Sequence, residues 1–418
     1  MSLARNRQPT PIPVIQPDIE IDLEYVTSWM LELLRIHSPT GYTDPITRVV
    51  AAELERLGAQ YELTRRGAIR VTLPGRRSTP ARAIVGHLDT LGAMVRELKP
   101  NGRLGIKPVG TWSSRFAEGA RVSVFTDTEI LRGTILPLKA SGHVYNDEVD
   151  TQEVSWEHVE VRVDADAYVK QDLLNLGVNI GDFVGVDAQP ELLKNGFINS
   201  RHLDNKAGVA VLLGVIKQLI ETKTSLPTDL HVLFTISEEV GSGASAVLRG
   251  DVAEMVSIDN GTVAPGQESS EMWPSICLAD SSGPFDYHLS RHLLQLCRDH
   301  HILHGRDVFR HYRCDSASAV EAGNDIRTAL VTFGVDASHG YERTHMDAIA
   351  GITRLLIAYC RTPPVFDEDT RMLESIDQFP ETRETPIPSL TPDRPVPESH
   401  QDEDSDEQAA EFSENGDP

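Results

Sequence analysis

The chain contains 418 residues with a mass of 46.1 kDa, and 40% of its residues are hydrophobic while 24% are charged. This length predicts two or three folded units, and the composition supplies enough apolar residues for a sizeable core, which excludes collagen-like, disulfide-stapled and wholly disordered chains. The formal net charge is −24. That charge argues against nucleic acid and against an anionic membrane as binding partners.

The sequence lacks the usual marks of export or membrane insertion. No window approaches about 18 uncharged apolar residues, so no transmembrane helix is expected, and the N-terminal segment has no apolar signal core. The cysteines lie far apart and form no CxxC pair, which is typical of reduced thiols; they are Cys277, Cys297, Cys314 and Cys360. We therefore expect a cytoplasmic protein.

Helical and strand patterns alternate along much of the chain. Apolar residues recur at helical spacing over 23–34, and a second helix is predicted to start at Thr43-Asp44-Pro45, where a capping-type residue precedes a proline. The later predicted elements are strand 83–86, helix 207–220, strand 231–236, short helix 244–248, strand 255–258, helix 291–300, strand 328–333 and helix 346–359. This alternation predicts an α/β fold in which helices flank a sheet.

The stretch 96–194 has a different pattern. It is rich in glycine, valine, threonine and charge, and runs such as 120–125 and 158–163 have the character of short strands. We expect it to form a small β-rich domain inserted into the α/β domain. The predicted organisation is a discontinuous catalytic domain, 1–95 and 195–362, with the insertion at 96–194.

The C-terminal stretch 363–418 is acidic and proline-rich. It holds 17 acidic and 3 basic residues, a net −14, so the rest of the chain carries −10. Such a segment buries too little apolar surface to offset its ordering entropy. We expect a disordered, solvated tail, with an interaction role as the less favoured alternative.

The first candidate site segment, Gly86–Thr90, comes at the end of the apolar strand 83–86. His87 and Asp89 stand there in a His-x-Asp pattern, and α/β proteins place functional groups at the carboxyl ends of strands. The pair suits a metal-bound imidazole with a carboxylate beside it. A lone His–Asp pair is, however, more often structural.

Two aspartates are further candidates, each with a structural alternative. Asp204 lies in the segment Ser200–Gly208, which opens a long apolar helix, and its carboxylate could bridge two cations. Helix N-capping is the competing interpretation. Asp259 follows the short strand 255–258, where the sequence Asp-Asn-Gly also suits a turn.

Glu238 and Glu239 follow the hydrophobic strand 231–236 after one serine. Like charges at a buried strand end are costly unless a cation neutralises them. A metal ion would neutralise one glutamate and leave the other as a general base. The alternative is two exposed glutamates on a turn.

The segment Asp336–His345 follows strand 328–333 and offers two candidate ligands, His339 and His345. With the preceding segments it completes a set of nitrogen and carboxylate donors without cysteine, which suits zinc, cobalt or manganese. Three ligands per ion and one shared carboxylate would leave room for a bridging water. Two ions about 3.5–4 Å apart would polarise a carbonyl and lower the pKa of that water.

In chain order these segments contain HLD, LDNKAG, SEEVG, IDNG and SHGYE. This order resembles the dinuclear metallo-aminopeptidases of the tetrahedral-aminopeptidase/glutamyl-aminopeptidase family, over about residues 20–362. The resemblance implies a β-rich dimerisation domain, a homo-oligomer (a dimer or a twelve-subunit shell) and short-peptide substrates. Segments 280–287 and 339–345 further resemble a subgroup associated with the osmoprotectant N-acetylglutaminylglutamine amide, which implies glutamine-containing dipeptides.

The resemblance also implies residue roles, with zinc as the first expectation for two divalent ions and cobalt or manganese as alternatives. One ion would be held by His87 and Asp259, the other by Glu239 and His339, and both by Asp204; Glu238 would be the general base and Asp89 would orient His87. The last segment departs from the family's His-Ser-Pro pattern. The distance to the apolar pair Leu355-Leu356 of the last predicted helix favours His339 as the ligand, with His345 as the alternative.

Two other functions compete with an aminopeptidase. A metal-dependent deacylase, amidohydrolase or carboxypeptidase of a neighbouring clan usually carries its insertion after the glutamate pair, whereas this insertion precedes Asp204. A non-catalytic scaffold with an acidic tail is the second alternative. Loss of a ligand or of Glu238 would have supported it, and none is lost.

Overall fold

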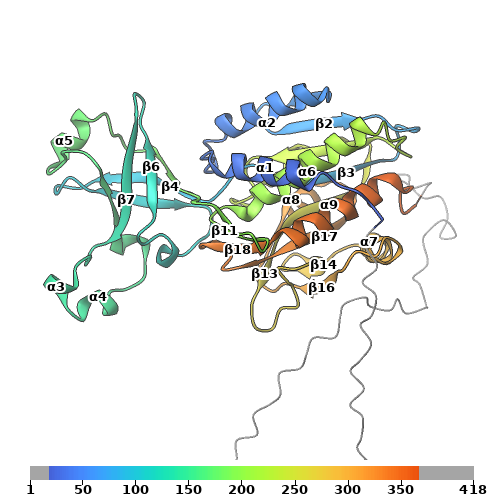
Figure 1. The fold of residues 1–418 in the computed structure, drawn as a ribbon. Coiled ribbons are helices and arrows are strands. Elements are labelled where there is room, and N and C mark those ends of the chain that lie inside the picture. Colours follow the sequence, from blue (N-terminus) through green and yellow to red (C-terminus); the bar gives the residue numbers. More distant parts are fainter. Residues whose placement is uncertain (1–17, 367–418) are drawn as a thin grey trace, which may run out of the picture.

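The computed structural model describes residues 18–366. It contains a large β-sheet with helices packed on it and a separate closed β-barrel, which lie side by side in Figure 1. This arrangement confirms the predicted fold class, an α/β domain with a mixed sheet and an inserted small β-rich domain. The predicted tail, 363–418, lies outside the described residues except for 363–366.

Twelve strands form the large sheet in the described range. Its path runs β1 (Tyr61–Leu63), β2 (Ile69–Leu73), β12 (Leu230–Thr235), β3 (Ala81–His87), β13 (Val252–Val263), β17 (Arg327–Asp336), β18 (Glu342–His345), β11 (Phe197–Ser200) and β10 (Glu191–Leu192). A branch leaves β17 through β14 (Pro274–Asp280), which pairs with β15 (Gly283–Pro284) and β16 (Gly305–Val308).

The centre of the sheet is parallel. Strands β12, β3, β13 and β17 are neighbours that run in the same direction. His87 on β3 pairs with Thr235 on β12, and Asp259 on β13 pairs with Thr332 on β17. Every residue of β3 is buried, as expected for a parallel strand covered on both faces. The carboxyl ends of these four strands therefore meet at one edge of the sheet.

Helices pack on this sheet. They are α1 (Leu23–Leu34), α2 (Asp44–Leu57), α6 (Leu203–Glu221), α7 (Tyr287–Asp299), α8 (Asp315–Glu321) and α9 (Met346–Arg361). All of them except α8 were predicted, and the short helix predicted at 244–248 is a 3-10 helix, Gly243–Ala246. Helix α6 is buried along most of its length because it is apolar nearly all round. At Gly214 an added Cβ would lie 2.5 Å from Val26 of α1, so the glycine allows these helices to touch.

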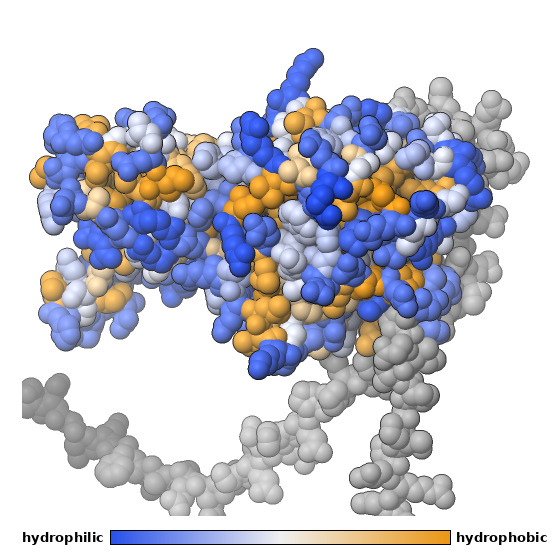
Figure 2. Space-filling model, turned by 45° about the horizontal axis from the view of Figure 1, so that its top comes forward, coloured by the Kyte–Doolittle hydropathy of each residue, from blue (hydrophilic) through white to orange (hydrophobic). Residues whose placement is uncertain are grey.

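The barrel closes in the order β4 (Gly92–Leu98), β5 (Leu104–Val109), β8 (Val159–Val163), β7 (Ile130–Pro137), β6 (Arg121–Phe125) and β9 (Phe183–Val186). It encloses its own apolar core and carries the short helices α3 (Gly142–Tyr145), α4 (Glu148–Thr151) and α5 (Lys170–Asn175). Large apolar side chains such as Val144, Tyr168 and Ile180 are exposed, and Figure 2 shows apolar surface at this end.

A buried ion pair joins the sheet to α9. Arg82 on β3 contacts Glu254 on β13 at 2.8 Å, and both side chains are almost fully buried. The Tyr359 hydroxyl donates to Glu254 at 2.9 Å, and the Tyr359 ring lies 4.2 Å from the Arg82 guanidinium carbon. The guanidinium would be left without its counter-ion if the glutamate were removed.

We expect Glu254→Ala to lower the free energy of unfolding by about 3–5 kcal/mol, because it leaves Arg82 as an uncompensated buried charge. Glu321→Ala, which removes an exposed partner of Arg313, is the matched control and should cost at most about 1 kcal/mol. Urea unfolding followed by circular dichroism measures both. Equal losses for the two variants would contradict this account of the network.

Candidate metal centre

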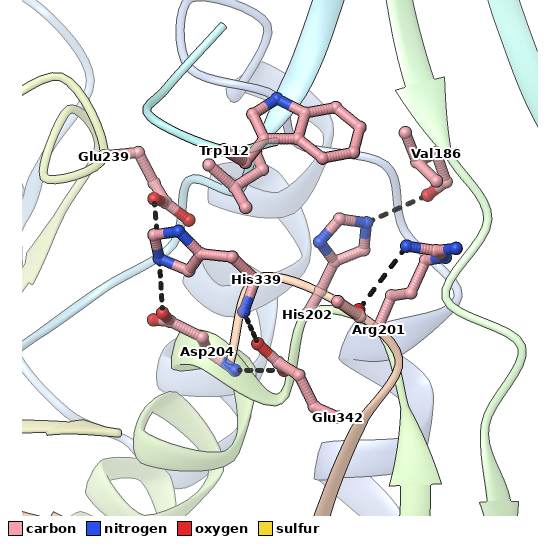
Figure 3. A pocket seen from close by; sticks show the side chains of 10 residues that line it. Trp112, Val186, Arg201, His202, Asp204, Glu239, His339 and Glu342 are labelled. Atoms are coloured by element: carbon pink, nitrogen blue, oxygen red, sulfur yellow. Dashed lines mark hydrogen bonds and ion pairs between the residues drawn. The ribbon is translucent and has the colours of Figure 1, made fainter. Parts of the chain in front are cut away.

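The strand ends and the start of α6 bring the predicted ligands into one cluster. His87 ends β3, the glutamate pair follows β12, Asp259 lies within β13, and His339 follows β17. Figure 3 shows Asp204, Glu239 and His339 facing one another at the pocket. The segments that the sequence singled out therefore meet at the carboxyl edge of the parallel strands, as the α/β rule predicts.

Asp204 lies at the centre of this cluster. Its Oδ1 is 3.0 Å from His87 Nε2, and its Oδ2 is 3.4 Å from His339 Nε2. The Asn260 side-chain amide also donates to Oδ2, at 2.5 Å. The two oxygens of one carboxylate thus face two different imidazoles, which is the arrangement that a ligand shared between two cations requires.

The side-chain contacts of Asp204 are not those of a helix cap. Asp204 has non-helical φ and ψ angles of −71° and 105° at a kink in α6, and a capping residue would also have non-helical angles. Its carboxylate oxygens, however, contact His87, His339 and Asn260, and among the described residues they accept no backbone amide of α6. The N-cap alternative therefore does not describe this residue.

The remaining candidate ligands lie within the same small volume. His87 Nε2 is 3.8 Å from Asp259 and 3.9 Å from Glu238, and His339 Nε2 is 4.0 Å from Glu239. Among the described residues, two groups of donor atoms lie within 4.8 Å of one another, His87–Asp204–Glu239 and His87–Glu238–Asp259. The two groups share His87, which marks it as the most central of the imidazoles.

Backbone carbonyls orient both imidazoles. His87 Nδ1 lies 2.8 Å from the Asp89 carbonyl oxygen and His339 Nδ1 lies 2.8 Å from the Thr111 carbonyl oxygen, so each ring directs Nε2 toward Asp204. The Asp89 carboxylate is farther from His87, at 3.6 Å. It instead accepts hydrogen bonds from the amides of Glu238 and Glu239, at 3.1 and 3.3 Å. Asp89 therefore fixes the turn that carries the glutamate pair.

The cluster concentrates buried negative charge. Burial raises the pKa of both Glu238 and Glu239 well above the usual range, and burial next to Asp204 raises the pKa of Asp259 to about 6. Burial would also raise the pKa of Asp204, but the two histidines outweigh it and hold that pKa below its ordinary value.

The pKa of His339 is raised as well, although burial alone would lower it. Burial favours the neutral imidazole, but the hydrogen bond to Asp204 and the charge of Glu239 outweigh it and raise the pKa of His339 to about 10. Within residues 18–366, no lysine or arginine lies within ion-pair distance of Asp204 or of the glutamate pair. Divalent cations would supply the missing positive charge, and the donor set of imidazole and carboxylate fits them.

The structure separates the two histidines between which the sequence left a choice. His345 is the N-cap of α9, where its Nδ1 accepts the Asp347 amide at 3.1 Å. Its Nε2 contacts the Asn195 carbonyl oxygen at 2.8 Å, and its ring packs against Phe197. These contacts hold His345 outside the cluster, so only His339 faces Asp204.

Sequence reasoning missed several residues of the site. Glu342 is buried and joins two of the site segments, because its carboxylate accepts the backbone amides of His339 and Asp204 at 3.0 and 3.1 Å. Its place in the SHGYE segment was a usable signal, as was the place of Asn260 in IDNG. Thr111 gave none, because it acts through its backbone carbonyl and comes from the barrel.

A pocket of about 280 Å³ opens beside the cluster (Figure 3). Both domains line it, since Trp112 and Val186 belong to the barrel part of the chain. Its lining residues are Leu91, Trp112, Val186, Arg201, His202, Asp204, Glu239, His339, Gly340 and Glu342. The pocket places apolar walls next to the carboxylates, which suits a small substrate held against the metal centre.

Comparison with known families agrees with this geometry. The profile described as M42 glutamyl aminopeptidase matches residues 67–355. The chain belongs to the M42 peptidase family. The Bacillus subtilis (strain 168) protein named "Putative aminopeptidase YhfE" is 37% identical over 335 residues, which cover 80% of this chain and 96% of that protein. This member of the M42 family is a metallo-aminopeptidase, which acts through divalent metal ions.

Solved structures show the same fold. A TET aminopeptidase from the marine sediment archaeon Thaumarchaeota archaeon SCGC AB-539-E09 has a TM-score of 0.74 at 17% identity, covering 80% of this chain and 96% of that one. The Pyrococcus horikoshii TET1 peptidase has a TM-score of 0.71 at 21% identity, covering 80% and 99%. No helix between residues 18 and 366 is long and apolar enough to span a membrane.

We expect Glu342→Gln to weaken metal binding by about 10- to 100-fold, the range seen when residues that support metal ligands are changed. A glutamine has one acceptor oxygen for the two amides that Glu342 satisfies, and its NH₂ group would face the other amide. Titration of the apoprotein with zinc measures the affinity. Glu271→Gln, on the exposed ion pair with Arg343, is the control, and equal affinity of the two variants would contradict the assignment.

Proposed function

We propose that this metallo-aminopeptidase removes N-terminal residues from short peptides with two divalent ions per subunit, zinc being preferred over cobalt or manganese. The observation that carries the proposal is the Asp204 carboxylate, whose two oxygens face two different imidazoles at 3.0 and 3.4 Å. His87 and Asp259 would hold one ion, Glu239 and His339 the other, and Asp204 both. Divalent cations bound there polarise the scissile carbonyl and lower the pKa of a water molecule.

Glu238 is proposed as the general base. Its carboxylate lies 3.9 Å from His87 Nε2 and next to the pair of proposed ion positions. It would take the proton of the attacking water and return it to the leaving amine, which is the usual work of a positioned carboxylate. Its neighbour Asp89 supports this role. The Asp89 carboxylate accepts the Glu238 amide at 3.1 Å and so holds the backbone of Glu238 in place.

The alternatives are less well supported. Membership of the M42 family favours an aminopeptidase over a deacylase, amidohydrolase or carboxypeptidase of a neighbouring clan. The non-catalytic scaffold would require a missing ligand or a missing base, and Asp204, Glu238 and His339 are all present within one cluster. A cytoplasmic location is proposed because the four cysteines are free and buried.

For the substrate we propose dipeptides that contain glutamine, in line with the resemblance to the osmoprotectant-associated subgroup. Two segments carried that resemblance, and both are near the site. His339–His345 includes the proposed ligand His339. Segment 280–287 contacts Tyr312 through Ser281, and the Tyr312 hydroxyl donates to the Asn260 carbonyl at 2.8 Å, next to the amide that holds Asp204.

We also propose a homo-oligomer. The Pyrococcus horikoshii TET1 peptidase is described as assembling into a tetrahedron or a large octahedral shell. The barrel of this chain exposes apolar side chains, including Val144, Tyr168 and Val169, that a neighbouring subunit would cover. A dimer or a twelve-subunit particle would satisfy the proposal, and sedimentation velocity on the purified protein distinguishes either from a monomer.

We expect Glu238→Gln to retain both metal ions and to lose about 10²- to 10⁴-fold in kcat, the scale of general-base catalysis. Asp204→Ala should lose metal as well as activity, because it removes a ligand shared by both ions. Inductively coupled plasma mass spectrometry and hydrolysis of leucyl-p-nitroanilide measure the two properties. Wild-type rates in Glu238→Gln would contradict the assignment of Glu238 as the general base. Full metal content in Asp204→Ala would contradict the assignment of Asp204 as the shared ligand.

A panel of peptides tests the proposed substrate. Glutaminyl-glutamine and other glutamine-containing dipeptides should give higher kcat/KM values than leucine-rich peptides of six or more residues, if the resemblance to the osmoprotectant-associated subgroup extends to the substrate. Chromatography of the released amino acids measures the rates. Efficient cleavage of the long peptides together with no cleavage of glutaminyl dipeptides would refute the substrate proposal, while leaving the aminopeptidase assignment in place.

A further inference from the structure

The pocket beside the metal centre contains a cation that the hydrolysis described above does not use. Figure 3 shows Asp204, Glu239 and His339 on one side of the pocket and Arg201 on the other, with the His202 ring between them. The pocket is therefore bipolar, with the metal centre at one end and a guanidinium at the other.

No carboxylate in the described part of the chain lies within ion-pair distance of the Arg201 guanidinium, although the charge of Glu342 attracts it from farther away. The hydrogen bond of the guanidinium to the protein runs from Nη1 to the Gly340 carbonyl oxygen at a long 3.4 Å. A guanidinium has five N–H donors, so most of them are left for solvent or a ligand. The side chain is partly buried, and this burial lowers its pKa below the ordinary value. A desolvated cation without a partner is costly, which indicates a site for an anion.

The polar groups closest to Arg201 are already engaged elsewhere. Glu342 uses one carboxylate oxygen for the His339 amide and the other for the Asp204 amide. The Tyr341 hydroxyl donates to the Gln189 carbonyl oxygen at 2.7 Å. Neither side chain makes a direct contact with the guanidinium, so a direct ionic partner would have to come from outside the chain.

The position of Arg201 restricts what that anion is. The guanidinium donates to the carbonyl of Gly340, the residue that follows His339, and it lines the same pocket as Asp204 and Glu239. A peptide bound with its scissile bond at the metal centre would therefore place its neighbouring groups beside the guanidinium. A carboxylate on the first or second residue of a peptide is such a group.

We propose that Arg201 is the carboxylate receptor of the substrate pocket. Its fork of N–H donors would pair with a peptide carboxylate in the two-pronged geometry that arginine favours over lysine. The carboxylate is either the C-terminus of a dipeptide or the acidic side chain of the N-terminal residue. This inference rests on the proposed function, since it names the group that selects among peptides cleaved at the same metal centre.

Two matched pairs of substrates separate the two sources. Leucyl-leucine against leucyl-leucinamide differs only in the C-terminal charge, and glutamyl-leucinamide against glutaminyl-leucinamide differs only in the side-chain charge. For each pair the ratio of kcat/KM values is measured with the zinc-loaded protein, so that general effects of a substitution cancel. Calorimetric binding of the same four compounds gives a second readout that needs no turnover.

In the wild type we expect one pair to favour its charged member by about 10- to 100-fold, the size of a charge-assisted hydrogen bond. Arg201→Gln should bring that ratio close to one, and Arg201→Lys should reduce it by less. Arg96→Gln, which removes an exposed arginine of the barrel, should leave the ratio unchanged. If Arg201→Gln does not fold, Arg201→Lys decides, because a lysine cannot reproduce the two-pronged contact.

Wild-type ratios near one for both pairs, or a ratio that both Arg201 variants retain, would overturn the proposal. Failure of the proposed function has a different signature. In one outcome the metal-loaded protein cleaves none of the four compounds and still binds the charged member of one pair more tightly. That result would support Arg201 as the carboxylate receptor and contradict the proposed peptidase function. Cleavage of all four compounds at equal rates keeps the peptidase and loses the receptor.

Discussion

The structure depends on one electrostatic constraint, which is the burial of several carboxylates at the carboxyl edge of the parallel strands. Glu238, Glu239 and Asp259 have raised pKa values because burial disfavours their charged forms, and no lysine or arginine between residues 18 and 366 neutralises them. A folded chain tolerates such a cluster when cations bind to it. The metal dependence of the M42 family agrees with this constraint, because divalent cations supply the positive charge that these carboxylates lack.

Both domains contribute to holding that cluster in place. The sheet supplies the strand ends, and the turn at Asp204 directs a carboxylate at two imidazoles. The barrel supplies the Thr111 carbonyl that orients His339 and the Trp112 wall of the pocket. Because one proposed ligand is positioned by the barrel, displacement of the barrel would disturb the metal centre as well as the substrate pocket. The barrel therefore contributes to the proposed active site.

Much of the fold was predictable because local patterns dominate it. The apolar periodicity over 23–34 gave the bounds of α1, and the proline after Thr43-Asp44 gave the start of α2, in agreement with the structure. The strands β14, β16 and β18 were missed because their hydrophobic runs are short or mixed with polar residues. Their pairing depends on neighbours distant in the sequence, which a local pattern does not reveal.

The site was predictable where function requires a particular side chain and unpredictable where it requires the backbone. The roles proposed for Asp204, Glu239 and His339 belong to their side chains, so their segments were visible in the sequence. The Thr111 and Asp89 carbonyls orient the imidazoles through atoms that every residue possesses. Arg201 was not predicted as a site residue for another reason. A lone arginine beside a ligand segment is not a functional signal in the sequence, and only the structure shows that no carboxylate in the part it describes lies within ion-pair distance of it.

The central claim is that Asp204 is shared between two metal ions. Anomalous diffraction from crystals grown with zinc, recorded above and below the zinc absorption edge, tests it most directly. The account predicts two peaks about 3.5–4 Å apart, one on each side of the Asp204 carboxylate. A single peak, or two peaks of which only one lies within bonding distance of Asp204, would contradict it.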